Sequence, residues 1–109
     1  MINRSVVIVK AKQPFVNWLA MMPSPEVISL EELNREPNAY LIPEYDEEAE
    51  REGIMRNYYV KIFEQELWAW SRDENEWPVI RDYAAFKQWF QLEYAPLVFD
   101  LDDIELTED

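Results

Sequence analysis

The sequence predicts an α/β fold, with α+β as the alternative: a single small domain in which helices pack on a three-stranded sheet. The chain has 109 residues, which is the length of one domain. Hydrophobic residues make up 49% of it and aromatic residues 15%, enough to build a core. Strand-like and helix-like apolar patterns follow one another in the order βααβααβ. Such strand–helix–strand units, joined by right-handed crossovers, suggest a small sheet with helices packed on it.

The first strand and the first two helices are predicted within residues 5–37. Residues 5–11 are rich in β-branched side chains and almost continuously apolar, which predicts a strand buried on both faces. Pro14 suits the first turn of the helix that follows. A second helix, of two turns, begins at Ser29, because Ser29 and Glu32 can form a capping box. The apolar stripe of the first helix consists of Phe15, Trp18, Leu19 and Met22.

The second half of the chain repeats this order. Pro43 ends a short strand and indicates a strand end or a sheet edge. The globular domain is expected to span residues 1–101, with an acidic tail at 102–109. The predicted elements are a strand at 39–45, a helix from Asp46 to about Ser71, a loop at 73–78, a helix at about 82–94 and a strand at 97–101.

Charge is the unusual feature of the composition. Ten basic and 23 acidic residues give a net charge of −13. Residues 1–43 carry four basic and four acidic residues, so the whole excess lies in residues 44–109, with six basic and nineteen acidic. Such a field repels nucleic acids and anionic membranes and attracts basic proteins or cations. We therefore expect no direct contact with nucleic acid or membrane.

The composition excludes most catalytic chemistry. The chain has no histidine, no cysteine and a single glycine, Gly53. These absences exclude Ser-His-Asp triads, thiol catalysis, zinc sites of the His/Cys type and glycine-rich phosphate loops. No cofactor and no enzymatic activity are predicted.

Carboxylates are the chemistry that remains. A cluster after the last predicted strand could present oxygen atoms to Mg²⁺ or Ca²⁺. It lacks the glycine turn of an EF-hand, so a solvated acidic tail is the alternative interpretation. The cluster consists of Asp100, Asp102, Asp103 and Glu105.

Three tryptophans stand close together at residues 68–77, and the helical wheel separates their roles. At 100° per residue, the inner side of the long helix is predicted to carry Trp70, whereas Trp68 points away from it. Trp77 lies near the end of the predicted loop and is expected to fold back over the helix end. The predicted core stripe consists of Tyr59, Val60, Phe63, Leu67 and Trp70.

The outer side of the same helix carries a half-apolar seam with a 4-3-4-3 spacing. One interpretation is an exposed strip that binds a partner or a second copy of the chain. The other is that a neighbouring helix or the tail covers it. We call this set of residues the seam; it consists of Ile54, Tyr58, Lys61, Gln65 and Trp68.

These features favour a non-enzymatic, acidic protein-interaction module. Its partner would be a protein, which could be basic or could itself bind nucleic acid, with carboxylates imitating phosphates. The alternatives are a carboxylate-based divalent-cation binder or metal-dependent enzyme, and a structural homodimer formed through the seam. A cytoplasmic location is expected, because the apolar run at 6–9 is too short for a signal peptide and there is no cysteine.

Three stretches resemble a group of small, acidic, uncharacterised proteobacterial proteins of about this length. The resemblance covers most of the chain and implies a bacterial, cytoplasmic, single-domain protein. It includes no catalytic motif and implies no activity or ligand. The stretches are RSVVIVKAKQPFVNWL (4–19), EYDEEAE (44–50) and LWAWSRDENEWP (67–78).

Overall fold

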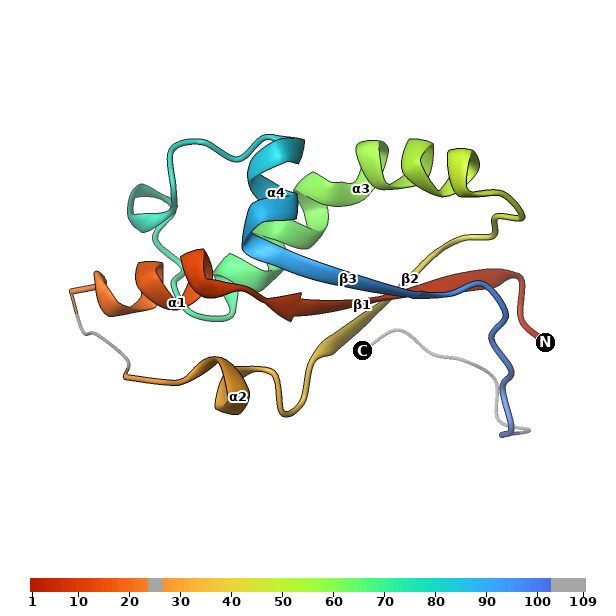
Figure 1. Cartoon of the computed structure of the whole chain (residues 1–109), viewed down its shortest axis with the longest axis horizontal. Helices are drawn as coiled ribbons and strands as arrows, with labels where there is room; N and C mark the ends of the chain where they lie inside the picture. The colour runs from red at the N-terminus through yellow and green to blue at the C-terminus, as the bar shows by residue number, and fades with distance from the viewer. Residues whose placement is uncertain (24–26, 103–109) are drawn as a thin grey trace.

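The structure of the protein is a computed structural model, which describes residues 1–23 and 27–102. The elements follow in the predicted order, with one short 3-10 helix, η1, in this part of the chain (Figure 1). They are β1 (Arg4–Ala11), α1 (Gln13–Ala20), α2 (Leu30–Leu33), β2 (Asn38–Pro43), α3 (Glu48–Trp68), η1 (Glu74–Glu76), α4 (Tyr83–Trp89) and β3 (Phe90–Ala95).

The strands form one antiparallel sheet in the order β2-β1-β3. Val7 of the central strand lies opposite Tyr40 of β2 and Tyr94 of β3. The predicted fold class and three-stranded sheet are confirmed. The expectation of right-handed crossovers does not apply to neighbouring strands, because that rule concerns parallel pairs. Instead β2 and β3 run in the same direction on either side of β1, and α3 and α4 lie together on one side of the strands (Figure 1).

The hydrophobic core lies between the sheet and helices α1, α3 and α4. At its centre is Phe90, the first residue of β3. The ring centroids of Phe15, Phe63 and Phe86 lie 5.4, 5.4 and 5.3 Å from the Phe90 ring centroid. Such tilted and edge-on pairs each contribute about 0.5–1.5 kcal/mol beyond area burial. One phenylalanine from each helix therefore fixes the three helices on the same face of the sheet.

The central strand β1 is buried on one face, which corrects the prediction of burial on both. Ser5, Val7 and Val9 are buried, whereas Val6 and Ile8 are partly exposed. Neither Val6 nor Ile8 belongs to the core cluster or to the partly buried hydrophobic residues packed against it. Because successive side chains of a strand point to opposite faces, the core covers the face that carries Ser5, Val7 and Val9.

The long helix α3 ends earlier than predicted. Its last residue is Trp68, and a turn follows. Since the chain leaves helical geometry there, the wheel no longer places Trp70 on the inner side. The Trp70 side chain is 38% exposed, so the prediction that it belongs to the core is wrong.

The inner side of α3 is also turned relative to the predicted stripe. Phe63 and Leu67 are buried as predicted, but Met55 and Ile62 join them. Val60, which was predicted to face the core, is 43% exposed. The observed centre of the buried side differs from the predicted one by about 40° at 100° per residue.

The last helix begins where it was predicted but ends earlier, and the last strand lies earlier in the chain than predicted. α4 begins after Asp82, whose Oδ1 accepts a hydrogen bond from the N–H of Ala85 at 2.8 Å, and it ends at Trp89. β3 follows at once, instead of at 97–101. The apolar spacing up to Phe90 suits either a helix or a strand. Pairing with β1 decides in favour of the strand.

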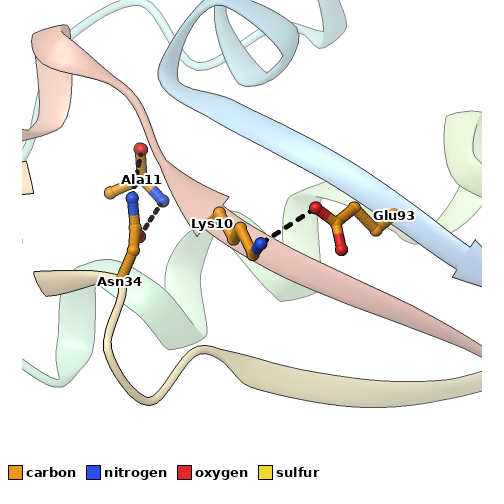
Figure 2. A network of polar contacts seen from close by, with 4 residues as sticks. All are labelled: Lys10, Ala11, Asn34 and Glu93. Atoms are coloured by element: carbon orange, nitrogen blue, oxygen red, sulfur yellow. Dashed lines mark hydrogen bonds and ion pairs between the residues drawn. The ribbon is translucent and has the colours of Figure 1, made fainter. Parts of the chain in front are cut away.

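Asn34 joins the end of α2 to the end of β1 (Figure 2). Its Oδ1 accepts a hydrogen bond from the N–H of Ala11 at 2.7 Å, and its Nδ2 donates to the carbonyl oxygen of Ala11 at 2.9 Å. The side-chain amide thus extends the ladder beyond the last β1–β2 pair, Val9 with Asn38. α2 itself has one turn instead of two, and Ser29 Oγ caps it by accepting a hydrogen bond from the N–H of Glu32.

Within residues 1–23 and 27–102, no helix combines the length and the apolar character that a membrane crossing requires.

Candidate functional site

The seam predicted on α3 is mostly on the surface. Tyr58 and Trp68 are 37% and 45% exposed, and Lys61 and Gln65 are exposed as well. Ile54 is partly buried and packs against the core. The structure therefore brings four of the five predicted residues onto one surface and leaves Ile54 out of it.

A groove runs between this surface of α3 and the strand β2. It has a volume of about 570 Å³, within the range of sites that bind ligands. One wall is formed by residues 38–42 of β2. The other is formed by Tyr58, Lys61, Ile62 and Gln65 of α3.

A second hollow continues the groove toward the end of α3. It measures about 310 Å³ and shares Lys61 and Gln65 with the first. Trp68 lies in its wall, together with Glu64, Glu74 and Trp77. Trp68 thus belongs to the same continuous surface as Tyr58, although ten residues separate them.

The wall contributed by β2 is a free sheet edge. In the described part of the chain β2 pairs with β1 alone, so the backbone N–H and C=O groups on its outer edge form no hydrogen bonds to another strand. Edge strands are usually protected by charged side chains, prolines or bulges. β2 has the sequence NAYLIP, without a charge and with proline only at its end. It can therefore accept another strand.

The sequence prediction missed this wall. It placed the strand and recognised Pro43 as a sign of an edge, but a wheel drawn for one helix cannot identify the strand beside it. An uncharged strand ended by proline was the available signal.

Tyr40 and Asn38 of β2 are bonded to α3. The hydroxyl of Tyr40 and the side-chain amide of Asn38 both donate hydrogen bonds to Oε2 of Glu66, the amide at 2.7 Å. Burial, and next the hydrogen bond to Glu66, raise the pKa of Tyr40 well above its ordinary value of 10. Tyr40 therefore stays protonated at neutral pH and holds Glu66, so this cluster fixes the groove wall.

Cations lie over both exposed rings of the surface. Nζ of Lys61 is 5.7 Å from the ring centroid of Tyr58, and Cζ of Arg72 is 5.3 Å from that of Trp68. At exposed sites such contacts are worth about 0.5–1 kcal/mol. They limit the directions in which the two rings point.

Trp77 folds back over the end of α3, as predicted. It is buried, and its Nε1 donates a hydrogen bond to the carbonyl oxygen of Ser71 at 2.9 Å. Trp77 also lines the second hollow, together with Trp68.

The carboxylate cluster proposed for cations is only partly described. Asp100 and Asp102 are exposed, and Oδ1 of Asp100 accepts a hydrogen bond from the N–H of Asp102 at 2.9 Å. Asp103 and Glu105 lie outside the described residues. Among the residues that are described, no three acidic side chains are grouped as a metal ion requires. Cation binding there stays a prediction.

No protein family, curated protein or solved structure matches the chain. The resemblance to small acidic proteobacterial proteins therefore stays a prediction.

Proposed function

We propose that this protein is a non-enzymatic, acidic interaction module that binds an extended segment of a basic protein in the groove between β2 and α3. The observation that carries the proposal is the free, uncharged edge of β2 beside the exposed rings of α3. An extended segment suits this site better than a helix or a small molecule, because it can pair with the strand and fill the groove at once.

Backbone pairing would supply the affinity that does not depend on sequence. The segment adds as a fourth strand beside residues 38–43, and its N–H and C=O groups bond to those of the β2 edge. Because side chains alternate along a strand, every second residue of the segment then points into the groove, toward Tyr58 and Ile62.

The exposed aromatic side chains would supply the preference for particular residues. Tyr58 and Trp68 lie at the two ends of the surface, in the first and second hollow. Aromatic residues commonly act as anchors in protein interfaces, because they bury much area at little cost in conformational entropy. Apolar or aromatic side chains at alternate positions of the segment would pack against them.

Charge would select a basic partner. Residues 44–109 hold the whole net charge of −13, and Glu64 and Glu74 lie in the wall of the second hollow. This field would accelerate the approach of a basic segment and slow that of an acidic one, most strongly at low salt. The absence of cysteine fits the reducing cytoplasm, which we propose as the location.

Selection from a phage-displayed library of random peptides, about ten residues long to match a strand, tests the proposal. We expect the selected peptides to combine lysine or arginine with apolar residues at alternate positions. In NMR spectra, binding should shift the amide signals of Ala39 and Leu41 and protect them from exchange. Affinity should fall at least tenfold in Tyr58→Glu and in Trp68→Glu, and should also fall as salt rises.

Val60→Glu is the matched control, because it adds the same charge to an exposed position of the same helix outside both hollows. It should leave the affinity within about twofold of that of the native chain, because an added acid outside the hollows does not repel a basic segment. Equal losses in Val60→Glu and Trp68→Glu would show a general charge effect and contradict the proposal. Peptide binding that leaves the β2 amides unchanged would contradict strand addition.

A further inference from the structure

The second face of the sheet is apolar and lies outside the core. Along β1, Val6 and Ile8 point to the face opposite Val7 and Val9. Pairing places Val6 between Leu41 and Ala95, and Ile8 between Ala39 and Glu93. We call this surface the outer sheet face; its apolar side chains belong to Val6, Ile8, Ala39, Leu41 and Ala95.

This face is incompletely covered, although the strand pattern leads one to expect full cover. Leu41 is 54% exposed, and Val6 and Ile8 are partly exposed. β-branched residues on both faces of a strand are typical of sheets that are covered on both sides. α3 and α4 together lie over the other face, where the core is (Figure 1). The sequence of β1 therefore suits a sheet with a second layer on its outer face.

The outer sheet face is almost neutral, although the chain carries −13. Nζ of Lys10 lies 2.9 Å from Oε1 of Glu93, so these two charges compensate each other between β1 and β3 (Figure 2). Arg4 stands at the other end of the same face. Two copies of so acidic a chain repel each other over most of their surfaces, and this repulsion is smallest where the neutral faces meet.

We propose that a second copy of this chain covers the outer sheet face, so that two sheets pack face to face in a symmetric dimer. The twofold axis would lie between the two sheets, near Val6, and would run parallel to the sheets and perpendicular to the strands. It would stack the apolar side chains of the two copies. It would also bring Arg4 of each copy toward Glu93 of the other. The face is thus complementary to itself, as a twofold interface requires. The dimer shares Ala39 and Leu41 with the β2 wall of the groove, whereas the α3 wall lies over the opposite face of the sheet.

The available area makes this dimer weak. Three strands about 4.8 Å apart and six residues long cover about 300 Å² of flat surface. A stable interface buries about 800 Å² of accessible surface on each partner, and a side-chain layer exposes more than its flat projection. We expect dissociation in the micromolar range, with monomer dominant in dilute solution.

The absence of cysteine allows a direct test on the full chain. Under mild oxidation, Val6→Cys should form disulfide-linked dimers at a rate at least tenfold above that of Val79→Cys. Val79 is 94% exposed, so its variant measures random collision at a more accessible thiol. Trp68→Cys tests the alternative dimer through the seam. Equal or faster cross-linking of either comparison variant would overturn the proposal.

Sedimentation at increasing concentration supplies the second measurement. The native chain should show a reversible monomer–dimer equilibrium, weakened at least tenfold by Ile8→Lys. Leu41→Lys, at a more exposed position, should have the same effect and an unchanged melting temperature. A native chain that stays monomeric at high micromolar concentration overturns the proposal. So does a chain ending at Asp102 that dimerises more tightly, because residues 103–109 would then cover the face themselves.

Discussion

The hydroxyl group of Tyr40 on β2 donates a hydrogen bond to the carboxylate of Glu66 on α3. The side-chain amide of Asn38 bonds to the same oxygen atom. One carboxylate of the helix thus holds two residues of the edge strand. The outer edge of β2 pairs with no other strand in the described part of the chain, while its side chains Asn38 and Tyr40 are fixed, so the strand would already be ordered for the proposed partner. Such preorganisation lowers the entropy cost of binding.

Replacing Tyr40 by phenylalanine should lower the free energy of unfolding by about 1–2 kcal/mol, because a hydrogen bond to a charged group is lost. Urea denaturation followed by circular dichroism measures this change. Tyr58→Phe is the matched control: it removes the hydroxyl of a more exposed tyrosine and should change stability by less than about 0.5 kcal/mol. Equal effects of the two substitutions would show that the Tyr40–Glu66 bond does not stabilise the fold.

Stability should fall in alkaline solution. Burial raises the pKa of Tyr40, Tyr83 and Tyr94 above the ordinary value of 10, and the carboxylates of Glu66 and Glu52 raise the first two further. In the unfolded chain these tyrosines lose their protons near pH 10, whereas in the folded chain they keep them. The unfolded state then binds fewer protons, so the free energy of unfolding decreases as pH rises.

Urea denaturation between pH 8 and pH 12 measures this effect. These tyrosines should leave the free energy of unfolding unchanged below about pH 10 and should lower it steadily above that pH. Tyr40→Phe should make the alkaline slope shallower by up to one proton. A slope identical to that of the native chain would show that Tyr40 ionises in the folded state as it does in the unfolded one.

The rotation of α3 is tested by two neighbouring truncations. Ile62→Ala removes a buried side chain and should destabilise the protein by about 2–4 kcal/mol. Val60→Ala removes an exposed one and should cost less than about 1 kcal/mol. Thermal or urea denaturation gives both values. The reverse ranking would mean that the helix presents the side predicted from the wheel.

Local patterns predicted much of the fold. The stripe of α1 is buried at Phe15, Trp18 and Leu19, and Ser29 caps α2 as its spacing indicated. Trp77 folds back as expected. These features depend on residues within a few positions of one another, so they can be predicted from the local sequence.

The errors arose where distant residues decide. Phe90 could continue a helix or begin a strand, and the antiparallel ladder with β1 made it a strand. Trp70 had a core position on the wheel, but the chain turns after Trp68 and exposes it. Neither outcome can be read from periodicity, because each depends on where another element packs.

The sequence predicted the residues of one groove wall, on α3, but not those of the other. Tyr58, Lys61, Gln65 and Trp68 share one surface, as their spacing implied, whereas Ile54 faces the core. The opposite wall, β2, could not be assigned, because a helical wheel describes one helix and contains no information about its neighbours.

The sequence by itself determined the order of the elements, the apolar stripe of α1, the cap of α2 and the concentration of acid in residues 44–109. Each of these is set by nearby residues or by composition. Only the tertiary structure decided that the strands are antiparallel, that β2 is an open edge beside α3, and that one face of β1 lies outside the core. These properties arise from contacts between segments that are far apart in the chain. The free energies of such contacts cannot be predicted from a local sequence pattern.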